Sequence, residues 1–216
     1  MEPLLPTTKH RRGRRTARQE RALADPGPAL LSLDTLGTVT SGDRPLVLDI
    51  GFGTGETVVA MAQAQPETDI LGVDMHTPGI GDLLATIQER QLANVWVVDA
   101  DARLALEQIP SGRLAGVRTF FPDPWPKKRH HRRRLVTADF ADAVAKRTAV
   151  GGFWHLATDW AEYADQIDEV VGGHAAWSGG RIPRPIERPQ TKYERRGKAA
   201  DREPVDLYFT RIEMPE

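Results

Sequence analysis

One stretch, residues 46–55, constrains the fold more than any other part of the chain. The short apolar run LVLDI at 46–50 is followed by Gly51, Gly53 and Gly55 at every second position. A run of this length is typical of a strand buried on both faces of a parallel sheet. The glycines permit a tight turn, and apolar residues at helical spacing follow them. The stretch predicts a strand–turn–helix unit whose helix N-terminus can approach a ligand closely.

The alternation of apolar strands and amphipathic helices continues to the C-terminus. We expect strands at residues 46–50, 70–74, 95–98, 117–121, 153–157 and 205–212, with helices at 54–63, 81–92, 104–109, 138–149 and 161–171. Repeated units of this kind predict an α/β fold, a doubly wound and mostly parallel sheet with helices on both faces. The chain of 216 residues is long enough for one such domain, at 41–216.

The first forty residues have no clear periodicity and break at Asp25-Pro-Gly-Pro28. We expect residues 1–40 to form a mobile basic arm with a short helix at 30–36.

Composition removes several classes of protein. The chain has no cysteine, which excludes disulfides, thiolate metal sites and cysteine nucleophiles. No apolar run has the length of a membrane span, and no hydrophobic signal segment precedes the domain. We therefore expect a cytoplasmic protein, monomeric or homodimeric, that does not bind a membrane. His130 and His131 have no carboxylates beside them, so no metal site is expected.

The net charge of −1 conceals a strong asymmetry. Residues 9–21, 127–134 and 181–202 hold 21 of the 29 Lys and Arg residues. The rest of the chain carries 8 basic residues against 26 acidic ones. Three basic segments on an acidic body favour a polyanionic partner, with nucleic acid the leading candidate, although three solvated loops would give the same pattern.

Acidic residues stand at three successive strand ends. Asp49 precedes the glycines, Asp74 ends the second strand, and Asp101 follows the third. The spacing G-x-G-x-G differs from the G-x-G-x-x-G of dinucleotide folds, which weakens the case for a nicotinamide-dependent oxidoreductase. Asp49 suits a cationic amino-acid group, Asp74 ribose hydroxyls and Asp101 an adenine edge. The set predicts S-adenosylmethionine as the cofactor, and the alternative is a strand–turn–helix unit without a ligand.

A second distinctive stretch is FFPDPWPKK at residues 120–128. Asp123 follows the fourth strand, where ligands bind in open α/β sheets, and the flanking prolines restrict its backbone. Trp125 offers a face on which a base could stack. The alternative is a proline-rich loop around a buried tryptophan. The following basic residues are expected to contact RNA phosphates; they are Arg129, His130, His131, Arg132, Arg133 and Arg134.

Several of these segments resemble the bacterial tRNA (guanine-46-N7-)-methyltransferase family. The matching motifs are DIGFGTGE, GVDMHTPGIG, FFPDPWPKKRHHRRRL, ATDW and RPQTKYERRG. The resemblance implies a class I methyltransferase fold with a seven-stranded sheet and one antiparallel strand, and it implies tRNA as the partner. It also implies a catalytic Asp123. The implied cofactor-binding residues are Asp49, Gly51, Gly53, Gly55, Asp74, Asp101 and Asp123. The implied substrate-binding residues are Lys127, Asp159, Thr191, Lys192, Tyr193 and Glu194.

The chain departs from the family pattern in two places. Members often have glutamate where Asp49 and Asp74 stand, and they carry Gly-His where Asp201-Arg202 stands. The second departure leaves the path of the final hairpin open. Asp159 could also be an ordinary helix N-cap, and residues 191–194 an ordinary polar loop.

The expected reaction is direct transfer of a methyl group to guanine N7, with Asp123 orienting the base and Asp159 or Glu194 assisting. A non-catalytic RNA-binding protein is the remaining alternative.

Overall fold

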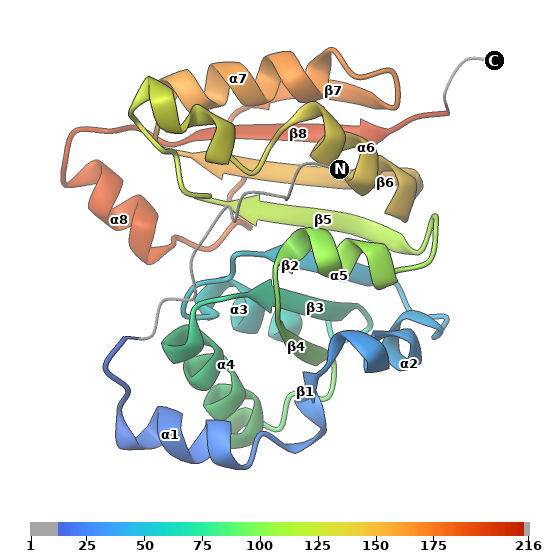
Figure 1. Ribbon diagram of the computed structural model, residues 1–216, viewed down its shortest axis with the longest axis vertical. Coiled ribbons are helices and arrows are strands. Elements are labelled where there is room, and N and C mark those ends of the chain that lie inside the picture. Colours follow the sequence, from blue (N-terminus) through green and yellow to red (C-terminus); the bar gives the residue numbers. More distant parts are fainter. Residues whose placement is uncertain (1–12, 214–216) are drawn as a thin grey trace.

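A single mixed sheet of eight strands runs through the computed structural model, which describes residues 13–213 (Figure 1). In spatial order the strands are β1 (Leu30–Leu31), β4 (Val95–Asp99), β3 (Asp69–Asp74), β2 (Leu46–Ile50), β5 (Leu114–Phe120), β6 (Thr148–Thr158), β8 (Val205–Arg211) and β7 (Trp177–Ile182). Strand β8 is antiparallel to both of its neighbours, and the other pairings are parallel. The expected α/β fold with one reversed strand is confirmed, with one strand more than expected.

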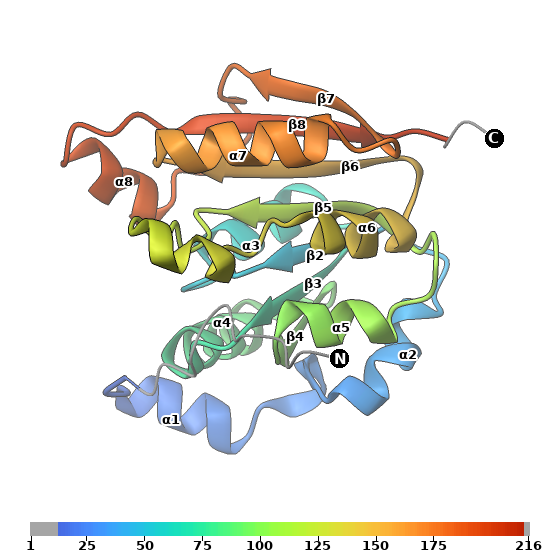
Figure 2. The same cartoon turned by 45° about the horizontal axis from the view of Figure 1, so that its top comes forward.

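Helices cover both faces of this sheet. They are α1 (Ala17–Ala24), α2 (Leu36–Thr40), α3 (Glu56–Ala64), α4 (Thr77–Arg90), α5 (Ala102–Gln108), α6 (Ala138–Arg147), α7 (Ala161–Gly172) and α8 (Lys192–Lys198). One hydrophobic core joins the sheet to α2, α5, α6 and α7, and the other joins it to α1, α3 and α4. Figure 2 shows α5, α6 and α7 on the near side of the sheet, with α3 behind β2.

The strand order reverses at the centre of the sheet. From β2 the chain passes to β3 and β4 on one side, and then to β5 and β6 on the other. Such a switch point leaves a crevice at the carboxyl ends of the central strands, where ligands of open α/β sheets bind. The glycine turn after β2 and the proline-rich loop after β5 both lie at this crevice.

The expected N-terminal arm is described only in part. Residues 1–12 of the expected arm lie outside the described residues. Helix α1 packs on α4, where Arg18 bonds the carboxylate of Glu89 at 2.8 and 2.7 Å and Gln19 bonds Asp82 at 2.9 Å. Thr16 and Gln19 close the start of α1 with a capping box. The described part of the segment therefore lies against the domain.

The prediction of a single helix at residues 30–36 was wrong. Leu30 and Leu31 instead pair with Val97 and Val98 and add β1 to the edge of the sheet. A short 3-10 turn, Leu33–Thr35, follows, and α2 begins at Leu36. The backbone of Leu30 and Leu31 pairs with β4 instead of forming a helical turn.

The path of the final hairpin is set by the turn after α8. The N–H of Arg202 donates to the carbonyl of Gly197 at 3.0 Å, and the N–H of Asp201 donates to Lys198 at 3.1 Å. This pair of bonds is a Schellman motif, which requires a left-handed residue just past the helix. Asp201 takes that position with φ of 53°. Aspartate tolerates this conformation better than most residues with a side chain, so the chain turns into β8 without a glycine there.

Candidate active site

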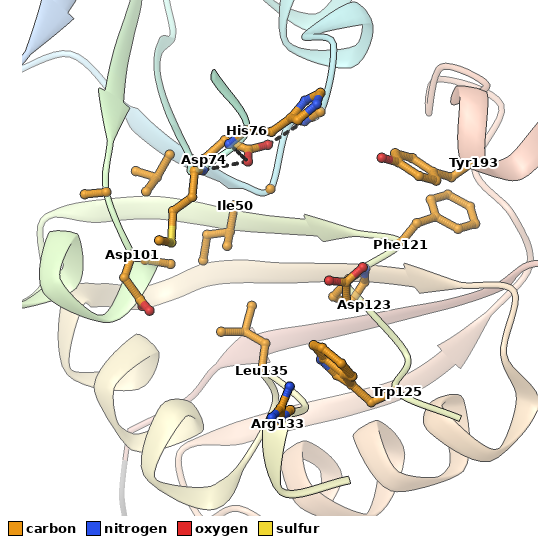
Figure 3. Close-up of a pocket in the computed structure, with 17 residues that line it drawn as sticks. Ile50, Asp74, His76, Asp101, Phe121, Asp123, Trp125, Arg133, Leu135 and Tyr193 are labelled. Carbon is orange, nitrogen blue, oxygen red and sulfur yellow. Dashed lines mark hydrogen bonds between the residues drawn. The ribbon is translucent and has the colours of Figure 1, made fainter. Parts of the chain in front are cut away.

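A cavity opens at the carboxyl ends of β2, β3, β4 and β5 (Figure 3). Asp101 and Asp123 stand on opposite sides of it, with Asp74 and His76 along its upper edge in this view. The lining also includes Ile50, Gly51, Gly53, Val73, Met75, Ala100, Ala102, Phe121, Pro122, Trp125, Arg133, Leu135 and Tyr193. The cavity thus joins the glycine turn, two of the three strand-end acids and the proline-rich loop, all of which lie far apart in the sequence.

The glycine turn forms one wall of the cavity. Gly53 and Gly55 have φ of 62° and 78°, in the left-handed region that favours glycine. A Cβ atom on Gly55 would lie 2.8 Å from the Leu83 side chain of α4. Helix α4 also approaches the turn so closely that a Cβ atom on Gly79 would lie 1.8 Å from the Gly53 carbonyl oxygen. The turn is therefore held between β2 and α4, with its backbone exposed to the cavity.

Asp74 holds the glycine turn in place. One of its carboxylate oxygens accepts from the Gly53 N–H at 2.8 Å. The other accepts from the N–H groups of Met75 and His76 at 2.7 and 2.9 Å. Burial raises the pKa of Asp74, and the three backbone bonds oppose this shift because they favour the charged form. The side chain lies at the cavity, where the sequence placed it, and it also organises the backbone.

Asp49 is buried in the sheet beneath the turn. The residue lines a second, smaller cavity with Phe52, Thr54 and the start of α8. Burial raises the pKa of Asp49 to about 7; Arg118, its pairing partner on β5, lowers it, and Asp74 raises it. The Asp49 Oδ2 atom has no hydrogen-bond partner among the described residues. A buried carboxylate without a donor is ready to accept one from a ligand.

Asp101 lies on the wall of the main cavity opposite Asp123 and caps the N-terminus of α5. It accepts from the backbone N–H of Arg103 at 3.0 Å and from the guanidinium of the same residue at 2.9 and 2.6 Å. Partial burial would raise the pKa of Asp101, but the bonds from Arg103 outweigh it and hold the pKa below its ordinary value. The capping role places this carboxylate at the end of β4, as the sequence predicted.

The loop after β5 brings Asp123 to the cavity. It begins at Phe121, whose φ of 54° is unusual for a residue with a bulky side chain. The Phe121 N–H donates to the carbonyl of Ala157 at 2.7 Å, so the turn is held to β6. Trp125 also has a positive φ, of 43°, and its buried indole N–H has no acceptor among the described residues. Strained backbone and an orphaned donor in one loop are features that cluster at functional sites.

The basic segment after this loop is divided between surface and interior. Lys127, Lys128, Arg129 and Arg132 are exposed, and Arg133 covers the ring of Trp125 with its guanidinium carbon 5.0 Å from the ring centre. His130 and His131 are half-buried, and the His130 ring meets Trp125 edge-on. The short 3-10 helix Lys128–Arg133 carries these side chains.

The structure corrects the expectation for Arg134. Its side chain is 1% exposed, so it is closed to RNA phosphates. The guanidinium donates to the Pro124 carbonyl at 2.8 Å and to Gln166 at 2.7 Å, and it covers the ring of Tyr163. Arg134 thus holds the proline-rich loop against α7.

The residues expected to bind the substrate near α8 also fall into two groups. Tyr193 is half-exposed and lines both cavities, and Lys192 lines the smaller one. Thr191 caps α8 by accepting from the Glu194 N–H at 3.0 Å. The Glu194 side chain is fully buried between Arg184 and Arg188, and this burial corrects the expectation that it meets the substrate.

Asp159 does not cap the helix that follows it. Its carboxylate accepts from Arg202 at 2.8 Å and lies against Gly197 of α8. A Cβ atom on Gly197 would approach the Asp159 Oδ2 atom to 2.6 Å. Asp159 therefore ties the start of α7 to the end of α8. Arg202 stands where the family pattern carries histidine, and it is the partner that forms this tie.

Sequence reasoning did not identify several groups of the site. Met75, His76, Phe121 and Leu135 line the cavity; all four lie inside the quoted motifs, but the sequence assigned no role to them. Within the described residues no cluster of three or more His, Asp or Glu side chains could hold a metal ion. Among residues 13–213, no helix is both long and apolar enough to cross a membrane.

Comparisons with known proteins identify relatives across most of the chain. Residues 43–207 match a family model described as a putative methyltransferase. The chain is 46% identical to the tRNA (guanine-N(7)-)-methyltransferase of Alkalilimnicola ehrlichii, over 95% of this chain and 92% of that protein. It is 43% identical to the protein of the same name from Streptomyces coelicolor, over 95% of this chain and 80% of the relative.

Solved structures with the same fold share little sequence with this chain. The 16S rRNA methyltransferase KamB superposes with a TM-score of 0.61 at 17% identity, covering 83% of this chain and 94% of that one. The 16S rRNA (adenine(1408)-N(1))-methyltransferase from Catenulisporales acidiphilia gives 0.55 at 18% identity, covering 86% and 95%. At these identities the likeness supports the fold, which is that of known methyltransferases.

Proposed function

Since the chain belongs to the putative methyltransferase family, and within it to the tRNA (guanine-N(7)-)-methyltransferases, we propose that it methylates N7 of guanine in tRNA with S-adenosylmethionine. Family membership confirms the resemblance noted in the sequence. The observation that carries the proposal is the cavity at the switch point of the sheet, where the glycine turn faces Asp101 on one side and Asp123 on another. Because tRNA is the proposed substrate, we place the protein in the cytoplasm.

The residues of the site fit S-adenosylmethionine. The unpartnered Asp49 Oδ2 atom is a buried acceptor for an ammonium group. The glycine turn has room for the close approach of a ligand, and Asp74 and Asp101 present carboxylates at the neighbouring strand ends. We propose that these three acids bind the amino-acid group, the ribose hydroxyls and the adenine edge, respectively. When bound, the cofactor supplies a methyl group on a positively charged sulfur.

Methyl transfer to guanine N7 does not require the protein to remove a proton. Its lone pair lies in the ring plane and carries no proton at neutral pH, so the chain need not provide a general base. The remaining demands are in-line positioning and stabilisation of the positive charge that develops on the purine. We propose that the Asp123 carboxylate meets both demands, because it can accept from the N1–H and N2–H donors of guanine. Trp125 lines the cavity beside it and carries Arg133 on one face of its ring, and we propose that the base stacks on the other face.

The exposed basic residues after Trp125 lie next to the cavity and suit a polyanionic substrate. Lys128, Arg129 and Arg132 are exposed within nine residues of Asp123 in the chain. We propose that they contact phosphates beside the target guanine, and that this guanine is number 46 of the tRNA variable loop. A guanine held in tRNA tertiary structure must be at least partly extruded to reach Asp123.

A methyl-transfer assay with nucleoside analysis tests this function. The protein is incubated with labelled S-adenosylmethionine and unmodified tRNA, and the digested RNA is analysed by chromatography and mass spectrometry. The expected product is 7-methylguanosine. Label in a different nucleoside would contradict the proposed target, and tRNA binding without any transfer would favour the RNA-binding alternative.

A further inference from the structure

A buried arginine outside the cavity connects the parts of the site. The Arg188 side chain is fully buried, and so are its two acidic partners. Its Nη1 atom donates to Glu194 at 2.8 Å, and its Nε atom lies 2.7 Å from the carboxylate of Asp206. Asp206 in turn contacts His155 of β6 at 2.8 Å, and Arg184 contacts Glu194 from the more exposed side at 2.9 Å. Arg188 thus joins α8 to β8, and Asp206 continues the connection to β6.

The flat face of the same guanidinium packs on the strand that leads to Asp123. Its central carbon lies 5.6 Å from the ring centres of both Phe120 and Phe121. Phe121 is the residue with φ of 54°, and it begins the turn that presents Asp123 two positions later. A strained backbone persists only when its surroundings hold it. Arg188 is one of the groups that hold Phe121, together with the backbone bond to Ala157.

One of the two acidic partners of Arg188, Glu194, is adjacent in the chain to a residue that lines the cavity. Glu194 lies in the first turn of α8, next to Tyr193, whose ring lines the cavity opposite Asp101 (Figure 3). The two-pronged guanidinium fixes direction as well as distance, which a lysine cannot do. The orientation of α8, and with it the position of Tyr193, therefore depends on the same side chain as the turn at Phe121.

We propose that Arg188 is a positioning residue for methyl transfer. It fixes the position of Asp123 through the Phe121 turn and the position of Tyr193 through Glu194, and so holds the two residues at a defined placement relative to each other. This inference rests on the proposed function. A buried ion pair can often be replaced by apolar residues at no cost in stability, so stability alone does not account for a charged group here. A guanidinium contacts α8, β8 and the end of β5 at the same time, with defined directions to its two carboxylate partners, and an apolar side chain cannot do this.

The test uses Arg188→Lys, which keeps the charge but loses the fork and the flat face. The matched control is Arg113→Lys, because Arg113 bonds the backbone carbonyls of Thr40 and Arg44 away from the cavity. The protein has three tyrosines, so labelling with 3-fluorotyrosine gives three fluorine resonances, with Tyr193 assigned by Tyr193→Phe. We expect kcat to fall by at least about ten-fold in Arg188→Lys, with KM for tRNA and Kd for S-adenosylmethionine within about three-fold. Arg113→Lys should keep the parent kcat.

The fluorine spectrum separates positioning from a loss of fold. In Arg188→Lys the Tyr193 resonance should shift or broaden while that of buried Tyr163 stays unchanged. An unchanged Tyr193 resonance would overturn the proposal, and so would displacement of Tyr193 and Tyr163 together, which indicates a merely structural role. If Arg188→Lys does not fold, Glu194→Gln is judged by the same two resonances. If the parent protein transfers no methyl group, the proposed function fails, and the Tyr193 resonance alone decides the role of Arg188.

Discussion

Burial of Asp49 should make the binding of S-adenosylmethionine depend strongly on pH. Burial raises the pKa of this carboxyl from 3.8 to about 7, so the protein without ligand holds Asp49 mostly protonated in mild acid. Binding of a cofactor ammonium group requires the charged form. Affinity should therefore rise with pH until Asp49 is ionised, and binding below that point should release a proton from the protein.

The size of the effect follows from the ionised fraction. At about pH 5.5 roughly 3% of Asp49 is ionised, and at about pH 7 roughly half is, so affinity should rise about fifteen-fold between them. Both conditions lie below the pKa of an ordinary α-amino group, about 7.7–8.0, so the cofactor's own ammonium stays largely protonated.

The stability of the unliganded protein should fall, not rise, as the pH increases over this range. A carboxyl with a raised folded-state pKa contributes less to the free energy of unfolding as pH rises from about 4 to about 7.

Isothermal titration calorimetry in two buffers with different ionisation enthalpies measures both affinity and proton release. Near pH 6 the parent protein should release close to one proton per cofactor bound. The control is Asp49→Asn, which should bind more weakly but lose both the proton release and most of the pH dependence. A parent protein with constant affinity and no proton release would contradict this prediction, because Asp49 would then be ionised already or would not contact the cofactor.

Three further predictions concern the remaining parts of the site. Asp123→Asn should keep the fold and tRNA binding while methyl transfer falls by about 100-fold or more, measured under single-turnover conditions; transfer at the parent rate would contradict charge stabilisation by this carboxylate. Replacing Lys128, Arg129 and Arg132 with alanine should weaken tRNA binding. It should also flatten the slope of log affinity against log salt by about 2 to 3 units, because each phosphate contact adds roughly 0.7–0.9 to that slope. An unaltered slope in filter-binding titrations would show that these three residues do not contact phosphates. Asp201→Gly should change the free energy of unfolding by no more than about 1 kcal/mol, in the stabilising direction, since glycine adopts φ of 53° freely; clear destabilisation in thermal unfolding would argue against the turn geometry.

The local sequence was sufficient to predict the position of a residue where that position depends on its neighbours in the chain. The apolar run before Gly51 and the acids at strand ends predicted the central strands and one wall of the cavity, because burial and turn geometry leave direct marks in sequence. Strand β7 was missed, since Gly179 and Gly180 interrupt its apolar pattern. Strand β1 was missed because two residues are too few to show any period.

Long-range partners explain what the sequence could not show. Arg134, Arg188 and Glu194 sit in strongly charged segments, and such segments usually face solvent. Arg134 and Arg188 are buried with partners in other segments, Gln166 and Asp206, and Glu194 is buried because it pairs with Arg188. Asp201 was noticed as a departure from the family pattern, but its left-handed conformation could be recognised only from the backbone of the folded chain.

Replacing a single atom of the substrate tests the proposed methylation of guanine N7. Two tRNA molecules are compared, one with guanine at position 46 and one with 7-deazaguanine there, in which carbon replaces N7 and the attacking lone pair is gone. We expect one methyl group on N7 of guanine 46 in the first tRNA, located by nuclease digestion and mass spectrometry. We expect no transfer to the second tRNA, although both should bind with the same affinity. Equal methylation of the two molecules would show that N7 is not the atom that is methylated.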